Sequence, residues 1–141
     1  MRKYGLAFYA YNPLGGGIFT GRYRGIDAAS EEGARFDPNT AQGKTYRQRY
    51  WNEGYFAAIE TVEAAAKQAG LSMTETALRW MSHHSLMKRE HGDAVIIGAS
   101  SVKHLEENLA DLEKGPLPQD VVDAVNVAWR TVAADNNKYW H

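Results

Sequence analysis

Cysteine is absent from all 141 residues of this chain. Disulfide bonds and thiol nucleophiles are therefore excluded, and the composition suits a reducing compartment. The chain also lacks any apolar run near the ~18 residues that a membrane-spanning helix needs. Its first residues pass from Met1-Arg2-Lys3 directly into a strand-like segment, without the pattern of a signal peptide. We therefore expect a cytoplasmic protein that does not enter a membrane.

An excess of charge of either sign is missing as well. The sequence holds 16 lysines and arginines against 17 aspartates and glutamates, for a net charge of −1. Proteins that bind nucleic acid or lie on an anionic membrane carry a clear positive excess. The composition predicts neither partner. Glycine and tyrosine, in contrast, are abundant, with 13 and 8 copies gathered mostly in the first third.

The most informative segment is a strand, a turn and the start of a helix. Three β-branched residues at positions 95–97 predict a strand buried on both faces, as in a parallel sheet. Gly98 permits a sharp turn, and Ser100 or Ser101 supplies an N-cap for the next helix. The free N–H groups at such a helix start attract anions, although the arrangement is common and alone indicates phosphate only weakly.

A second strand is expected near the N-terminus, where residues 6–11 form an apolar and aromatic run typical of a buried strand. Asn12-Pro13 ends this strand, and residues 14–21 continue as a glycine-rich loop. That loop is either a flexible turn or a place where backbone approaches a ligand closely, with Arg22 as the neighbouring cation. Composition alone leaves both interpretations open.

Residues 22–50 show no sustained periodicity, and glycines such as Gly43 are expected to interrupt any helix there. An irregular segment of this length usually forms a binding loop or a lid. Its end, residues 45–51, places two arginines among three aromatic residues. These side chains either bind an anionic or planar ligand or anchor the loop, and the anchor is slightly favoured.

Helices are expected in the remainder, because apolar residues recur at helical spacing. The first runs from Glu53 to Ala69 and ends at Gly70, and the second starts at the capping box of residues 72–75. A third follows the turn at Gly98, with its apolar face against the sheet, and the last follows residues 115–118. The expected apolar faces are Phe56, Ile59, Val62 and Ala66; Ala77, Leu78 and Met81; Leu105, Leu109 and Leu112; and Val121, Val125, Ala128 and Val132.

Two aromatic features remain. His83 and His84 fall near the end of the second helix, where adjacent side chains point about 100° apart and cannot chelate one metal together. A histidine at a helix C-terminus is favoured electrostatically, so no metal is expected. Tyr139-Trp140 close the chain, and such a pair usually packs into a surface groove. The order β, long loop, α, α, β, α, α predicts an α/β fold with parallel strands.

Several motifs together resemble the aldo-keto reductase family. Residues 9–17, Tyr-Ala-Tyr-Asn-Pro-Leu-Gly-Gly-Gly, with Thr20-Gly21-Arg22-Tyr23, resemble its seventh strand and the loop after it. Residues 77–81 resemble the second helix beyond that loop, and residues 97–108 resemble the eighth strand and the NADP-binding helix. Residues 45–51, the run Met-Ser-His-His-Ser at 81–85 and Gly115-Pro116-Leu117 resemble the branch of aflatoxin-aldehyde and succinic-semialdehyde reductases. The resemblance covers nearly the whole chain.

This resemblance implies that residues 1–141 are the C-terminal, NADP-binding part of a (β/α)8 TIM barrel. Only the last two strands and their helices are present, so the barrel is incomplete in this chain. The family's catalytic tyrosine, lysine, aspartate and histidine come from the first half of the barrel. The resemblance therefore assigns no catalytic residue here, and it implies no metal.

The resemblance also implies a set of binding residues. Contacts to the nicotinamide ribose and pyrophosphate fall to Asn12, Pro13, Leu14 and Gly15, with Arg22 in place of the usual lysine. Contacts to the adenosine 2′-phosphate and adenine fall to Gly98, Ser100, His104, Glu107 and Asn108. Histidine at 104 replaces the usual glutamine or arginine, and histidines are mostly neutral at pH 7. Tyr46 and Arg49 match the substrate pocket, where the arginine receives a carboxylate, and His141 replaces the branch's C-terminal arginine.

Three functional hypotheses follow from the resemblance. The chain is the NADP(H)-binding portion of an enzyme that reduces aldehydes or ketones to alcohols, itself without the catalytic residues. Alternatively, it is a non-catalytic, truncated homologue that binds nucleotide, or a remnant that self-associates. Two strands with apolar faces and free edges predict a homo-oligomer, most simply a symmetric dimer.

Overall fold

The computed structural model describes residues 1–134. The elements in chain order are η1 (Arg2–Tyr4), β1 (Tyr9–Tyr11), η2 (Gly15–Thr20), α1 (Ala41–Tyr50), α2 (Glu53–Gln68), α3 (Met73–His83), η3 (Arg89–His91), β2 (Ala94–Ile96), α4 (Val102–Glu113) and α5 (Gln119–Val132). In this part of the chain the fold is therefore α/β, mostly helical, with two strands. The expectations for Tyr139, Trp140 and His141 lie outside the described residues.

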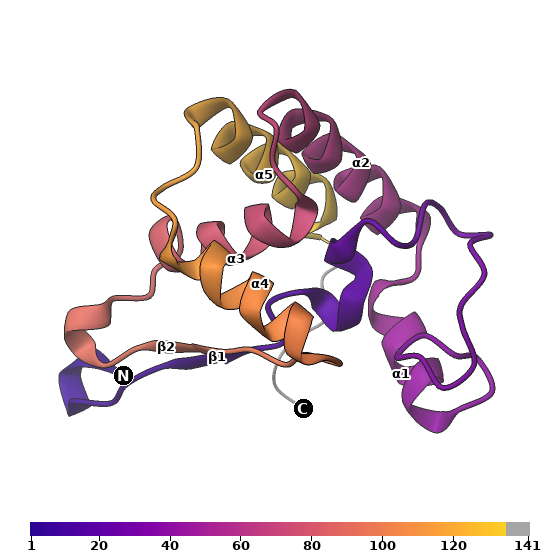
Figure 1. Cartoon of the computed structure of the whole chain (residues 1–141), viewed down its shortest axis with the longest axis horizontal. Coiled ribbons are helices and arrows are strands. Elements are labelled where there is room, and N and C mark those ends of the chain that lie inside the picture. The colour runs from indigo at the N-terminus through magenta and orange to yellow at the C-terminus, as the bar shows by residue number, and fades with distance from the viewer. Residues whose placement is uncertain (135–141) are drawn as a thin grey trace.

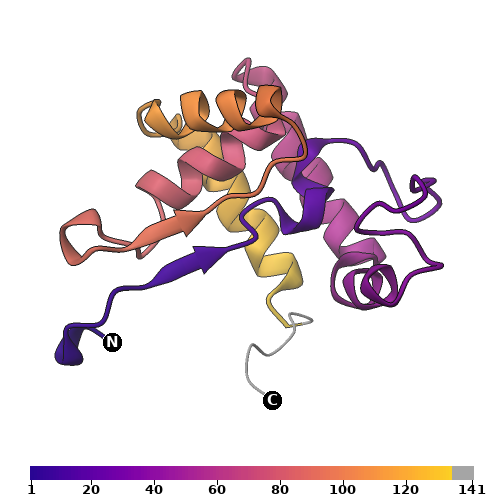
Figure 2. The ribbon, with the colours of Figure 1, turned by 60° about the horizontal axis from the view of Figure 1, so that its bottom comes forward.

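The two strands form one parallel pair, as predicted. Tyr9 is opposite Ala94 and Tyr11 is opposite Ile96. Figure 1 places this pair along the lower edge of the molecule, with α3 and α4 above it and α2 and α5 above those. Figure 2, turned by 60°, shows β1 on the outer side of β2, away from these helices.

The prediction that both strands are buried is wrong. Ala10 is the one buried residue of β1, whereas the side chains of Tyr9, Tyr11 and Ile96 are 61%, 73% and 52% exposed. A parallel strand is buried only where further elements cover both of its faces. In residues 1–134 helices cover one face, and the other faces solvent.

The helices predicted from apolar periodicity are confirmed, with one exception in packing. Helix α2 buries Phe56, Ile59, Val62 and Ala66 and packs along α5. The expected contact of α4 with the sheet is wrong, because α4 packs chiefly on α3 and leaves Leu105 and Leu109 at least 40% exposed. A helix buries its apolar face on whichever layer is wide enough, and two strands offer little width.

The prediction of an irregular chain up to Tyr50 is also wrong, because α1 forms over its last ten residues. Thr40 is the N-cap and accepts a hydrogen bond from Gly43 N at 2.9 Å. Gly43 is buried, and a Cβ there would lie 1.8 Å from the backbone oxygen of Asp37. Glycine is therefore required for close packing of α1 on the preceding loop, and it does not break the helix.

Within residues 1–134 the buried apolar side chains form two clusters. The larger joins α2 and α5 to the loop before α1 and contains four aromatic rings, of Tyr23, Phe36, Trp51 and Phe56. Tyr23 and Phe36 meet edge to face with centroids 5.3 Å apart, a favourable arrangement for aromatic rings. The smaller cluster joins Leu117, Val121 and Val122 to α2 and to Trp80 of α3. The long loop is thus anchored by its own aromatic side chains.

Candidate functional site

The carboxyl ends of the two strands bring together the two loops singled out in the sequence. Tyr11 and Ile96, the last residues of β1 and β2, are partners in the register. Residues 12–15 leave β1 and residues 97–101 leave β2 at the same edge of the sheet. Open parallel sheets bind ligands at this edge. The candidate site is therefore built from these two loops and the elements that contact them.

The loop after β1 is held in a tight conformation by its own polar groups. Asn12 has a φ of 61°, in the left-handed region, and its Oδ1 accepts a hydrogen bond from Gly16 N at 2.8 Å. Gly15 N donates to Asn12 O at 3.0 Å. Pro13 and Leu14 lie half-buried between them. The loop therefore offers a fixed, backbone-lined edge at this end of the sheet.

Tyr46 lies directly against this loop. A Cβ at Gly16 would lie 2.4 Å from Cε1 of Tyr46, so the ring fills the space that the glycine leaves. The Tyr46 hydroxyl accepts a hydrogen bond from Arg35 Nη1 at 3.3 Å. Helix α1 thus brings one of the two predicted substrate residues to the glycine-rich loop.

Tyr50, one turn further along α1, also belongs to this site, and the sequence analysis did not assign it there. Burial raises the pKa of the Tyr50 hydroxyl, and the charge of Arg49 and a hydrogen bond with the Asn12 side chain oppose that shift. The rings of Tyr46 and Tyr50 have centroids 5.9 Å apart. The i, i+4 spacing of the two tyrosines is the signal that could have identified Tyr50, because such residues share a helix face.

The two arginines of residues 45–51 have different surroundings. Arg47 donates through Nε to Phe36 O at 2.7 Å and through Nη2 to Ser30 Oγ at 3.2 Å. Its guanidinium carbon also lies 4.1 Å from the centroid of the Trp51 ring, a cation–π contact. Arg47 therefore anchors the loop. Arg49 is half-buried, and its charge acts on Tyr50 at the candidate site.

The loop after β2 leads into the N-terminus of α4, where three side chains are close together. Ser101 is the N-cap, and its Oγ accepts a hydrogen bond from His104 N at 3.2 Å. Ser100 Oγ lies 3.1 Å from His104 Nδ1, and both residues are exposed. A Cβ at Gly98 would meet no atom within 4 Å, so the space above this turn is open. The open end carries the positive pole of the α4 dipole.

Three other predicted cofactor residues, Glu107, Asn108 and Arg22, differ in burial and in their contacts. Glu107 is exposed and lies 3.8 Å from Lys103 Nζ. Asn108 is the one buried residue of α4, at 5% exposed. Arg22 is exposed, with Nη1 3.5 Å from Glu31 Oε2. Glu107 and Asn108 lie one turn after His104 on α4, whereas Arg22 lies on the segment after η2 and is paired with Glu31.

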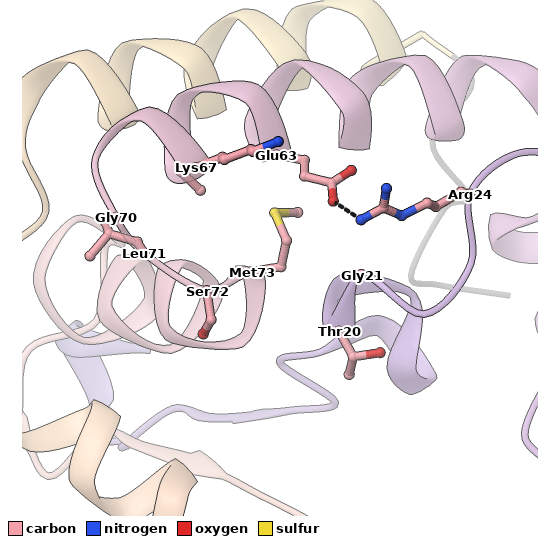
Figure 3. A pocket seen from close by; sticks show the side chains of 10 residues that line it. Thr20, Gly21, Arg24, Glu63, Lys67, Gly70, Leu71, Ser72 and Met73 are labelled. Atoms are coloured by element: carbon pink, nitrogen blue, oxygen red, sulfur yellow. Dashed lines mark hydrogen bonds and ion pairs between the residues drawn. The ribbon is translucent and has the colours of Figure 1, made fainter.

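Two open hollows lie away from the candidate site. The first, of about 420 Å³, lies between η2, α2 and the start of α3, and Arg24 and Glu63 form an ion pair of 2.9 Å at its rim (Figure 3). The second, of about 540 Å³ and mostly apolar, is lined by residues such as Phe8, Trp80 and Leu86. Neither is lined by a predicted cofactor or substrate residue.

Residues 1–134 contain neither a cluster of metal-binding side chains nor a membrane-spanning helix. Nowhere in this part of the chain do three or more His, Asp or Glu side chains gather in a way that could hold a metal ion. None of its helices is both long and apolar enough to cross a bilayer.

Comparison with known proteins gives consistent matches. The model of the aldo/keto reductase family matches residues 1–130. An aldo-keto reductase of Pseudocercospora fijiensis is 49% identical over 140 residues, and aflatoxin B1 aldehyde reductase member 2 of Homo sapiens is 48% identical over 145. The aldo-keto reductase pigE of Monascus ruber is 41% identical over 143. These alignments cover 99%, 99% and 100% of this chain but 47%, 40% and 42% of the relatives, so the chain spans less than half of their length.

Proposed function

The chain belongs to the aldo/keto reductase family, and from that premise we propose that it is the part of such an enzyme that binds NADP(H). The observation that carries this proposal is the meeting of two loops at the carboxyl edge of the parallel strands. One loop is lined by backbone, and the other ends in an open helix N-terminus with two hydroxyl groups and an imidazole. Dinucleotides place their phosphates at such positions.

The proposed binding residues divide between the two loops. Asn12, Pro13, Leu14 and Gly15 line the nicotinamide ribose and the pyrophosphate, with Arg22 as a cation beside them. Ser100 and His104 hold the 2′-phosphate, because they are exposed, close together and next to the free N–H groups of α4. Gly98 leaves room for the ligand, and Glu107 and Asn108 are assigned to the adenine. Bound NADPH supplies the hydride that reduces a carbonyl carbon.

For the substrate we propose an aldehyde or ketone that lies near Tyr46 and Arg49. Tyr50 extends this wall, since its ring contacts that of Tyr46. The similar human protein is named an aflatoxin B1 aldehyde reductase, which is consistent with an aldehyde. A positive charge at Arg49 favours carbonyl compounds that also carry a carboxylate.

The cofactor assignment is tested by comparing NADPH with NADH. We expect NADPH to bind more tightly, by up to about fivefold, which corresponds to the ~1 kcal/mol of one exposed charge pair. The His104→Ala variant should lower this preference, and the His91→Ala variant, at the exposed helical turn before β2, should keep it. Equal affinity of the unmutated protein for both cofactors would contradict the role of His104.

No residue of this chain is assigned as the proton donor, so we expect the 141-residue protein alone to lack aldehyde reductase activity. The assay is oxidation of NADPH in the presence of 2-carboxybenzaldehyde or succinic semialdehyde. Turnover above a buffer control, by protein of verified mass, would contradict this expectation. The mass of the protein isolated from its natural source separates two cases. A longer parent chain indicates that the 141 residues are a portion of a complete enzyme, and a mass of 15.7 kDa weakens that interpretation.

A second candidate function is a non-catalytic nucleotide-binding or self-associating module. The observation in its favour is the open face of the strand pair, where large apolar side chains meet solvent. If the protein isolated from its natural source has a mass of 15.7 kDa and binds NADPH without turnover, this candidate is favoured over the first.

A further inference from the structure

The C-terminal half of α3 holds the segment that joins α4 to α5. Arg79 donates through Nε to Gly115 O and through Nη2 to Pro116 O, both at 2.7 Å. Its Nη1 binds Glu75 Oε1 at 2.7 Å, and Glu75 Oε2 lies 3.0 Å from Lys114 Nζ. Because Glu75, Arg79 and His83 recur every four residues, they form one stripe along the helix.

The two adjacent histidines complete this set of contacts, and they do so in opposite chemical roles. His83 Nε2 lies 2.7 Å from Lys114 O, which can only accept, so His83 is the donor. His84 Nε2 lies 2.9 Å from Leu117 N, which can only donate, so His84 is the acceptor. The His83 contact survives protonation of its ring. The His84 contact requires a lone pair on Nε2 and is lost when that ring becomes charged.

The surroundings of His84 favour its neutral form. Burial lowers the pKa of His84, and the charges of His83 and Arg79 act in the same direction. The charged groups near it are Arg79 and His83 on α3, and Lys114 at the end of α4, which is paired with Glu75 and Asp111. From α5, Val121 and Val122 pack with Leu117, which is 6% exposed, so the contact lies next to an apolar cluster.

We propose that Glu75, Arg79, His83 and His84 form a clasp on residues 114–117, and that His84 makes the clasp sensitive to pH. At neutral pH His84 accepts from Leu117 N, and on acidification this contact is lost while those of Arg79 and His83 remain, which weakens the hold on the connection between α4 and α5. The sign follows from linkage, because a group that is harder to protonate in the closed state stabilises that state at high pH. Stabilisation is complete above about pH 6.5, the ordinary value for histidine, and is lost as the pH falls below it. This inference does not depend on cofactor binding.

The test is hydrogen exchange of the Leu117 amide in the full 141-residue chain, expressed as a protection factor so that intrinsic exchange cancels. Below about pH 6.5 we expect protection to fall by about tenfold per pH unit, until His84 is charged in the closed state as well. In the His84→Gln variant an amide oxygen replaces the ring nitrogen as acceptor, and protection should no longer depend on pH. The His83→Gln variant is the matched control: an amide N–H replaces the ring donor to Lys114 O, and protection should still fall below about pH 6.5.

A pH-independent protection factor in the wild-type protein would overturn the proposal. The same fall in His84→Gln, or loss of the fall in His83→Gln, would also overturn it. If His84→Gln does not fold, the nitrogen-15 resonances of the wild-type ring decide the question. At pH 7.5 they must show a proton on Nδ1 and none on Nε2, and a proton on Nε2 would exclude the contact with Leu117.

Discussion

Asp93 shows how much one side chain can hold in place. Its carboxylate is 1% exposed, accepts hydrogen bonds from Phe8 N and Lys88 N, both at 2.8 Å, and pairs with the guanidinium of Arg2. It therefore joins the segment before β1 to the turn before β2. The bond to Arg2 lowers the pKa of this carboxyl well below its usual range, and the two backbone amides act in the same direction.

We expect Asp93→Asn to lower the melting temperature clearly at pH 7, because a neutral amide cannot accept from all of these donors. A carboxylate with a lowered pKa stabilises the fold above the unfolded-state value of about 3.9, and this stabilisation is lost as the pH falls further. The deficit of the variant should therefore shrink between pH 5 and pH 2.5. Thermal unfolding followed by circular dichroism measures it, with exposed Asp27→Asn as the control. A deficit that is constant over this range would contradict the argument.

Gly43 is the second residue on which a local structure depends. A methyl group at this position would overlap the Asp37 oxygen, so Gly43→Ala should destabilise the protein by at least about 1–3 kcal/mol, the usual cost of overpacking. Gly54→Ala is the matched control, because its Cβ would come no closer than 3.4 Å to Asn52 Oδ1. In helix α2 that change should stabilise by about 0.5–1 kcal/mol. Urea unfolding of both variants measures the two changes in the free energy of unfolding, which should have opposite signs. Equal stabilities of the two variants would contradict this expectation.

At the scale of elements, four helices share the same kind of N-terminal cap. Thr40, Asn52, Ser72 and Ser101 each accept a hydrogen bond from the backbone N–H three residues ahead. Pro118, the N-cap residue of α5, makes no such side-chain bond. The sequence left Ser100 and Ser101 as alternative caps for α4. The structure assigns the cap to Ser101 and directs Ser100 to the ring of His104.

This assignment predicts different costs for two neighbouring substitutions. Ser101→Ala removes the cap and should lower the free energy of unfolding by about 1 kcal/mol. Ser100→Ala removes an exposed hydroxyl and should change it by less than about 0.5 kcal/mol. Chemical denaturation of the two variants under identical conditions is the measurement. Equal losses would show that the two serines share the cap.

Local patterns were sufficient for most elements but not for their surroundings. Helices α2, α3, α4 and α5 could be predicted, because apolar periodicity and N-caps depend on residues close together in the sequence. Helix α1 was missed because its fit to Asp37 depends on tertiary packing, and a glycine usually signals the end of a helix. The exposure of β1 and β2 was missed because it depends on which other elements cover the strands. The residues of a strand do not determine this. Within the site, both loops could be predicted, and Tyr50 could not until α1 was known.

For the whole molecule, the dominant feature is the open side of the strand pair. Tyr9, Tyr11 and Ile96 present large apolar surfaces to solvent, and in the described residues each strand has one edge without a partner strand. Such edges recruit other chains, and two strands alone are rarely stable. We therefore propose that the 141-residue protein associates with a second copy through β1 or β2.

Light scattering on the purified chain should give about twice the 15.7 kDa of one copy. Tyr11→Lys places a charge on the exposed face of β1 and should shift the mass toward the monomer. Tyr4→Lys, at an exposed position outside the strands, is the control and should leave the mass unchanged. A monodisperse, cooperatively unfolding monomer of the wild-type chain would show that two strands suffice for a stable fold without a second copy, and would contradict this proposal.

The pairing of β1 with β2 also determines when the sheet can form during synthesis. Arg2 and Phe8 contact Asp93 across 91 and 85 positions of sequence, and closing a loop of that length costs about 4 kcal/mol of chain entropy. β1 is synthesised before β2, and the pairing must wait roughly 4–17 seconds for residues 94–96 to follow. Helices α1, α2 and α3 are complete by then, because all three lie between the two strands in the sequence. The parallel pair is therefore among the last contacts of residues 1–96 to form.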